Sequence, residues 1–222
     1  MNNIQKALEN GQSIWLDSIS RDMLRSGELQ KFIDLGVTGV TSNPSIFDKA
    51  VAESDIYDES LLEYAKDGAS RETIFERLAV DDIRDAADVL RPVYDSASMR
   101  DGYVSIEVSP TLANDTEGTI TEARRLWAAI DRPNVMIKVP GTPDGVPAIK
   151  TLISEGINVN VTLLFAFSAY EAAATAYIEG LSEFAQSARD IPAAVASVAS
   201  FFVSRVDFYS FITIRFSSFK IF

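Results

Sequence analysis

Two patterns of apolar residues alternate along the chain. Short apolar runs are typical of strands, whereas apolar residues at every third or fourth position are typical of helices. The short runs predict strands at 14–16, 37–42, 103–108, 133–140, 157–165 and 194–203. The other segments predict helices at 21–35, at 45–100 with a break near 67–68, from 119 or one turn earlier to about 130, at 145–155 and at 168–180. A strand followed by a helix, repeated about six times, predicts parallel strands joined by helical crossovers.

The fourth predicted strand contains a single cation. Val135, Ile137 and Val139 alternate with Met136 and Lys138, so the lysine shares one face of the strand with the methionine. Lysines are almost never fully buried unless they are paired. One explanation is a lysine at a strand end that reaches solvent. The other is chemistry, because an amine held away from water is more often neutral and attacks a carbonyl to form a Schiff base.

Polar residues lie at or near the C-terminal end of each predicted strand. They are Asp17, Asn43, Glu107, Lys138, Asn160 with Thr162, and Ser200. In a (β/α) barrel these ends form the rim on which catalytic residues converge. The set supplies one amine, two carboxylates, two amides and two hydroxyls, which suits Schiff-base chemistry on a polyhydroxylated carbonyl compound. The alternative is that polar residues merely lead from strands into loops, which explains Asn43 better than Lys138.

The composition narrows the choice of chemistry. The chain has 222 residues, of which 47% are hydrophobic and 23% charged, and this is ordinary for a soluble globular domain. The net charge of −12 argues against a nucleic-acid partner or an anionic membrane surface. Without cysteine and histidine, disulfides, thiolate or histidine metal sites and Ser-His-Asp triads are excluded. We see no signal peptide and no apolar run long enough to span a membrane, so we expect a cytoplasmic protein.

Six segments of the chain closely resemble the transaldolases. They are 15–17, 41–45, 104–108, 136–138, 156–165 and 200–205, and the resemblance extends from about residue 10 to Asp207. It implies a TIM (β/α)8 barrel of the class I aldolase type. It also implies transfer of a dihydroxyacetone unit between sugar phosphates in the pentose phosphate pathway, without a metal or an organic cofactor.

The resemblance also implies roles for individual residues. Lys138 becomes the nucleophile that forms the Schiff base, and Asp17 becomes the general acid and base for carbon–carbon cleavage and formation. Glu107 and Thr162 become the pair that holds a water molecule relaying protons during imine formation. The substrate-binding residues implied in the same way are Asn43, Asn160, Ser200, Phe202, which lines the pocket, and Arg205, which binds phosphate.

The resemblance stops after Asp207. Residues 208–222 contain five phenylalanines, no acidic residue, and two basic residues, Arg215 and Lys220. Because six predicted strands are fewer than the eight of a TIM barrel, we expect residues 1–207 to form an incomplete barrel with about six of eight β/α units. We expect 208–222 to be an aberrant tail that is not native to the fold. The alternative is a native strand that replaces part of the barrel.

Three functions therefore remain open at the level of sequence. The first is a transaldolase, which is inactive here if the barrel is incomplete. The second is a fructose 6-phosphate aldolase-like enzyme, which shares the lysine. The third is a remnant without catalysis. For either enzyme the expected partners are small sugar phosphates, and self-association into a homo-oligomer is left open.

Overall fold

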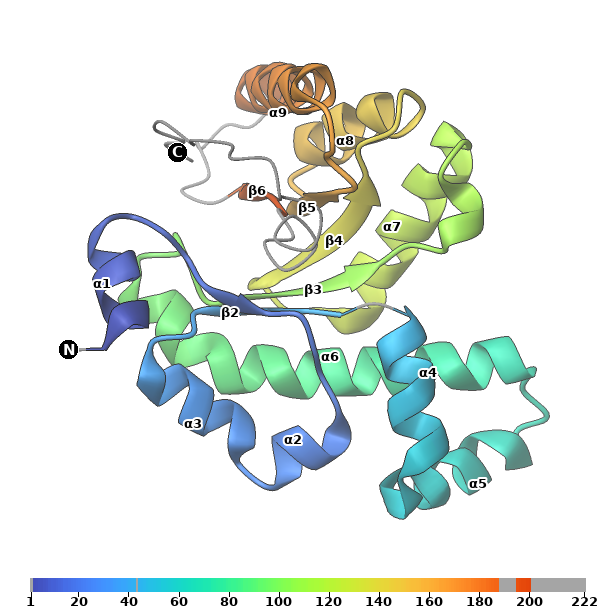
Figure 1. Cartoon of the computed structure of the whole chain (residues 1–222). Helices are drawn as coiled ribbons and strands as arrows, with labels where there is room; N and C mark the ends of the chain where they lie inside the picture. The colour runs from blue at the N-terminus through green and yellow to red at the C-terminus, as the bar shows by residue number, and fades with distance from the viewer. Residues whose placement is uncertain (1, 43, 188–194, 201–222) are drawn as a thin grey trace, which may run out of the picture.

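The computed structural model describes residues 2–42, 44–187 and 195–200, and in these ranges six parallel strands form one curled sheet (Figure 1). The strands are β1 Trp15–Leu16, β2 Gly39–Thr41, β3 Tyr103–Glu107, β4 Val135–Pro140, β5 Val159–Thr162 and β6 Ser197–Ala199. Each strand pairs with the next along the chain, so the order is β1-β2-β3-β4-β5-β6. This is the topology of a TIM barrel that lacks closure, and it confirms the predicted α/β class.

The helices of the described residues lie around the curled sheet, and several of them cover its outer face (Figure 1). The helices are α1 Asn3–Glu9, α2 Arg21–Arg25, α3 Glu28–Leu35, α4 Pro44–Glu53, α5 Asp58–Lys66, α6 Arg71–Ser96, α7 Thr116–Ile130, α8 Gly145–Ser154 and α9 Phe167–Ser187. Two 3-10 turns, η1 Asp55–Tyr57 and η2 Pro110–Leu112, complete the described elements. In Figure 1, α6 runs along β2 and β3, and α8 and α9 stack beyond β4 and β5. No helix among the described residues is long and apolar enough to cross a membrane.

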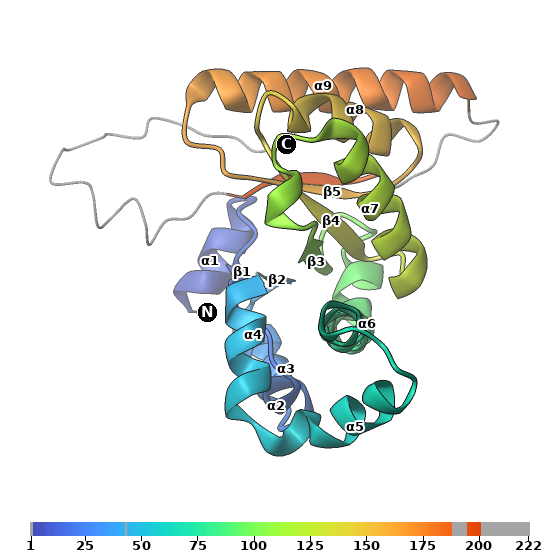
Figure 2. The ribbon, with the colours of Figure 1, turned by 90° about the vertical axis from the view of Figure 1, so that its right-hand side faces the viewer.

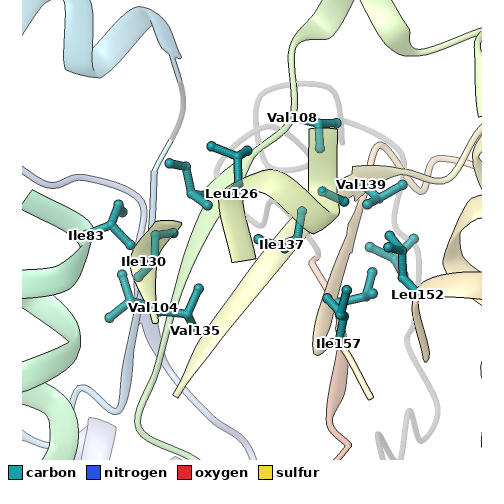
Figure 3. Packing of buried hydrophobic residues seen from close by; sticks show 14 of the residues in the cluster. Ile83, Val104, Val108, Leu126, Ile130, Val135, Ile137, Val139, Leu152 and Ile157 are labelled. Carbon is teal, nitrogen blue, oxygen red and sulfur yellow. The ribbon is translucent and has the colours of Figure 1, made fainter. Parts of the chain in front are cut away.

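The main core lies between the sheet and this layer of helices. Val104, Val135 and Ile137 point outward from β3 and β4 and are completely buried. They pack with apolar side chains of the covering helices, including Ile83 of α6 and Leu126 of α7 (Figure 3). Alternation along each strand then directs the intervening side chains to the concave inner face, which is the interior of the incomplete barrel.

A second, smaller core holds the helical insertion that follows β2. Phe47 of α4, Tyr57 of η1 and Leu78 of α6 are buried together, apart from the main core. Figure 2 shows α4 and α5 on the side of the molecule opposite to α8 and α9. The insertion is therefore anchored to the N-terminal half of α6 and not to the sheet.

The structure corrects several predicted boundaries near the N-terminus. The helix predicted at 21–35 is two helices, because Gly27 between them has a left-handed φ of +73° that breaks the helical path. An unpredicted helix, α1, begins with a capping box in which Asn2 and Gln5 satisfy each other's backbone amides. Pro92 was a candidate helix end, yet α6 continues through it to Ser96.

Further along the chain the boundaries also shift. Helix α7 begins at Thr116, the earlier of its two predicted starts, because Asp115 caps it by accepting from the Gly118 N–H. The strand predicted at 157–165 is shorter, since β5 ends at Thr162 and Leu163 has a φ of +60°. Helix α9 begins at Phe167 and extends to Ser187, past the predicted end near 180.

Candidate active site

The interior of the incomplete barrel is layered. Towards the N-terminal ends of the strands it is apolar, because Tyr103 and Met136 pack there with Trp15 and Val198. One level higher, every strand from β2 to β5 contributes a polar side chain. These are Thr41, Ser105, Lys138 and Asn160, and each is buried. The polar layer therefore lies on an apolar floor and faces the C-terminal rim.

Lys138 lies in the middle of this polar layer. Its side chain is only 2% exposed, although β4 holds it within a run of apolar residues. The Lys138 Nζ atom lies 3.2 Å from Glu107 Oε2 and donates to the Ser42 carbonyl at 3.2 Å. Strand register explains the first contact, because Glu107 and Lys138 are partners across β3 and β4. The lysine is thus buried and paired, which rejects the alternative of a lysine that reaches solvent.

A chain of hydrogen bonds crosses the interior beside the lysine. Ser200 Oγ donates to Asn160 Oδ1 at 2.6 Å, and Asn160 Nδ2 donates to Ser105 Oγ at 2.9 Å. Ser105 Oγ in turn donates to Thr41 Oγ1 at 3.0 Å. These bonds connect Ser200, directly after β6, with β5, β3 and β2, and they fix which way the Asn160 amide points. Asn160 and Ser200, two of the predicted substrate-binding residues, are therefore in direct contact.

Thr162 occupies the next inward position after Asn160 on β5. The side chain is 1% exposed, and its Oγ1 atom has no hydrogen-bond partner among the described residues. A buried hydroxyl without a protein partner needs an explanation, and a bound water or substrate group supplies one. This atom is the feature of the site that agrees best with a proton-relaying water.

Asp17 follows β1 directly, at the C-terminal end of the strand and at the rim of the barrel. Its side chain is exposed, unlike Lys138 and Glu107. Three other predicted binding residues, Asn43, Phe202 and Arg205, lie outside the residues that the structure describes, as does the predicted tail at 208–222.

Sequence reasoning did not assign Ser105, Thr41 or Ser42 to the site. The available signal was alternation, because Ser105 precedes Glu107 by two positions and must share its face. Thr41 precedes the predicted Asn43 by the same spacing. Ser42 could not be found this way, because it contributes its backbone carbonyl to Lys138.

A groove of about 540 Å³ opens beside the C-terminal ends of β2 and β3. Ser42 and Glu107 line it at the sheet, and Phe47 and Phe75 line it at α4 and α6. Burial raises the pKa of Glu122, another lining carboxyl, above its ordinary value. No group of acidic residues within the described part of the chain is arranged to hold a metal ion.

Comparison with known proteins decides the family of this site. Residues 14–212 match the model of the family described as transaldolase/fructose-6-phosphate aldolase. The chain belongs to this family. The transaldolase family is a TIM-barrel family, so the curled sheet of six parallel strands corresponds to part of its barrel.

Individual relatives are consistent with this assignment. A protein named transaldolase 2 from Nostoc sp. (strain PCC 7120) is 50% identical over 208 residues, which are 93% of this chain and 54% of that protein. The transaldolase of Trichodesmium erythraeum is 54% identical over 202 residues, covering 90% of this chain and 53% of that protein. The transaldolase of Thiobacillus denitrificans is 54% identical over 198 residues, covering 89% and 55%. The chain therefore spans about half the length of these transaldolases.

Proposed function

We propose that this chain carries transaldolase chemistry, in which Lys138 forms a Schiff base with a ketose phosphate and a dihydroxyacetone unit passes to an aldose phosphate. The observation that carries the proposal is the amine of Lys138, buried in the barrel interior with a carboxylate oxygen of Glu107 at 3.2 Å. A buried amine needs a base to remove its proton before it can attack a carbonyl, and the adjacent carboxylate is suited to that task.

The first half of the reaction uses Lys138, Glu107 and Thr162. The neutral amine adds to the C2 carbonyl of the ketose, and the resulting carbinolamine loses water to give an imine. The oxygen gains two protons in these steps: one from the nitrogen as the carbinolamine forms, and one that Glu107 took from the lysine ammonium, as the oxygen leaves as water and a protonated imine remains. Glu107 transfers them through a water molecule held with the Thr162 hydroxyl, whose unpaired Oγ1 supports this role.

The second half uses Asp17 as general base and then general acid. Its carboxylate takes the proton of the C4 hydroxyl while the C3–C4 bond breaks, which releases an aldose phosphate and leaves an enamine on Lys138. The enamine carbon then attacks the aldehyde of the acceptor, and Asp17 returns the proton. Asn160 and Ser200 bind substrate hydroxyls in this proposal, and their mutual hydrogen bond supports a common role.

The remaining assignments rest on the family alone. We propose Asn43 as a further ligand of the substrate hydroxyls, Phe202 as a wall of the pocket and Arg205 as the phosphate ligand. Ketose and aldose phosphates of the pentose phosphate pathway are the proposed substrates, since the curated relatives are named transaldolases. A closed TIM barrel has eight strands, two more than the six described. That this chain turns over substrate on its own is therefore a separate part of the proposal.

Reductive trapping tests the proposal. The chain is incubated with fructose 6-phosphate and sodium borohydride, and peptide mapping by mass spectrometry locates the reduced adduct. We expect the adduct on Lys138 and none on Lys150, a surface lysine paired with Glu179 and Glu183. An absence of adduct on Lys138 in a folded sample would show a chain without this catalysis.

The acceptor separates the two activities in the family description. A transaldolase retains the dihydroxyacetone unit until an aldose phosphate such as erythrose 4-phosphate arrives, whereas an aldolase releases it to water. We expect product formation from fructose 6-phosphate to depend on the added acceptor. Steady release of dihydroxyacetone without acceptor would instead favour the fructose 6-phosphate aldolase activity.

A further inference from the structure

A second group of charged side chains is buried outside the barrel interior. Arg21 of α2 is 4% exposed, and Tyr57 of η1 and Asp82 of α6 are completely buried. Arg21 Nε donates to Asp82 Oδ1 at 2.7 Å, and the Tyr57 hydroxyl donates to Asp82 Oδ2 at 2.7 Å. The same hydroxyl accepts from the backbone N–H of Arg21 at 2.8 Å. Three elements separated in sequence are thereby joined at one carboxylate.

Stability alone is a weak explanation for this cluster. Removing a guanidinium and a carboxylate from water is expensive, and a buried ion pair often contributes no more than well-packed apolar side chains would. Burial raises the pKa of Asp82 even though the Arg21 guanidinium and the Tyr57 hydroxyl oppose the shift. Such a cluster does fix orientation, because the Arg21 guanidinium donates, and the two carboxylate oxygens of Asp82 accept, only in a fixed geometry.

The position of the cluster in the fold indicates which part of the chain it orients. Arg21 is the first residue of α2 and follows Asp17 by four positions, so it ends the loop that carries the proposed acid–base residue. The strand before that loop is weakly anchored, since β1 contributes two residues and pairs only with β2 in the described sheet. Within the loop, Ile19 is buried in the main core, so the cluster at Arg21 is a second support on the C-terminal side of Asp17.

Asp82 supplies a rigid support. Its neighbour Ile83 is buried in the main core with Ile106 of β3, so α6 is fixed against the strand that ends in Glu107. The cluster thus connects the Asp17 loop to the same strand that places Glu107 beside Lys138. Tyr57 connects the helical insertion to this point as well.

We propose that Arg21, Tyr57 and Asp82 form a positioning cluster that holds Asp17 in place for carbon–carbon cleavage. This inference rests on the proposed function, in which Asp17 acts only after Lys138 has formed the imine. Variants of the cluster must therefore impair cleavage while leaving imine formation intact. A cluster that served stability alone would impair both steps together.

The test compares Tyr57→Phe and Asp82→Asn with the unaltered chain in two assays. Borohydride trapping with fructose 6-phosphate measures adduct formation on Lys138, and single-turnover release of the aldose phosphate measures cleavage. We expect trapping rates within about twofold of the unaltered chain, because the contacts of Lys138 remain. Release should fall about 10- to 100-fold, as expected for a misplaced catalytic group. Asp17→Asn serves as the benchmark and should show the same pattern with a larger loss.

A similar pair between α5 and α6 provides the control. The Tyr64 hydroxyl of α5 donates to Asp81 of α6, which directly precedes Asp82, and this pair is only partly buried. Tyr64→Phe and Asp81→Asn should leave both rates unchanged. Tyr57→Phe is the milder cluster variant and covers the case in which Asp82→Asn fails to fold.

Three results would overturn the positioning role. The first is an equal fall of the trapping rate and the release rate in the cluster variants. The second is no fall of either rate. The third is an unaltered chain that forms the adduct but releases no aldose phosphate. Failure of the proposed function has a different signature, because the unaltered chain would then form no adduct on Lys138. That result would also remove the role inferred for the cluster.

Discussion

The side chains on the two faces of β4 are about equally buried, but they are stabilised in different ways. On the outer face, Val135, Ile137 and Val139 are completely buried and belong to the apolar main core. On the inner face, Lys138 is as deeply buried, but its amine requires Glu107 and the Ser42 carbonyl as partners. Burial therefore does not distinguish the structural face from the candidate catalytic face, whereas the partners of the buried groups do.

The difference has an energetic consequence. Apolar burial on the outer face contributes directly to stability, at about 25 cal/mol per Å² of apolar surface removed from water. Polar groups on the inner face at best offset the loss of their hydration, and Thr162 Oγ1 is left without a partner among the described residues. We infer that the outer face determines stability and the inner face determines chemistry, and the following variants test this division.

Lys138→Met should have the largest effect on chemistry. It removes the amine and keeps an unbranched side chain, so the reduced adduct with fructose 6-phosphate should disappear. The free energy of unfolding should change little, because the amine is no longer desolvated while the Glu107 carboxylate, which is 13% exposed, loses its partner. Trapping followed by mass spectrometry and urea unfolding measure the two effects. Lys150→Met is the control and should keep the adduct, and an adduct that survives in Lys138→Met would contradict the assignment.

Ile137→Ala, one position earlier, should have the largest effect on stability. It opens a cavity in the main core and should lower the free energy of unfolding by about 2–5 kcal/mol. The control is Ile178→Ala on α9, where the side chain is 66% exposed and the change should stay within about 0.5 kcal/mol. Urea unfolding followed by circular dichroism measures both variants. Equal losses in the two variants would argue against the outer face as the source of stability.

Alternation along β4 was sufficient to predict this contrast from the sequence. It placed Lys138 with Met136 on one face, and the structure confirms that both lie in the barrel interior. Local signals failed where a single backbone angle decides the outcome, as at Gly27. They also could not reveal contacts between distant positions, because no local pattern links residues that tertiary packing brings together. Arg21 and Asp82 are 61 positions apart, and their ion pair depends on how α2 and α6 pack.

The contacts between strands were predictable only in part. Polar residues at strand ends indicated a shared rim, and Glu107 beside Lys138 follows from the parallel register. Thr41 beside Ser105 follows from the register in the same way. The hydrogen bond of Ser105 with Asn160 required the actual curvature of the sheet, which brings side chains of β3 and β5 within reach across β4. The pattern of residue types therefore predicted which groups the site contains, and the fold determined how they are paired.

Ser200→Ala should have an intermediate effect and tests the inner face without removing the nucleophile. It deletes the hydroxyl that donates to Asn160 Oδ1 and leaves that buried amide oxygen without its donor. The free energy of unfolding should fall by about 0.5–1.5 kcal/mol. Trapping should need a several-fold higher ketose concentration, because the Asn160 amide is less well oriented. Ser154→Ala removes a local bond to Thr151 on α8 and should leave trapping unchanged.

Asp88→Asn should have the smallest effect and tests an exposed ion pair of the helical layer. Hydrogen bonds from Arg132, at 2.6 and 3.0 Å, hold the pKa of Asp88 below its ordinary value. A lowered pKa in the folded state stabilises the protein above the unfolded value of about 4, and this contribution is lost as the pH falls through the lowered value. Solvent screens an exposed pair, so the loss at pH 7 should be far smaller than for Ile137→Ala. Urea unfolding at pH 7 and pH 3 should show a small difference from the unaltered chain at pH 7 that shrinks at pH 3 and in high salt. A difference as large as that of Ile137→Ala would mean that surface ion pairs, and not apolar burial, stabilise this layer.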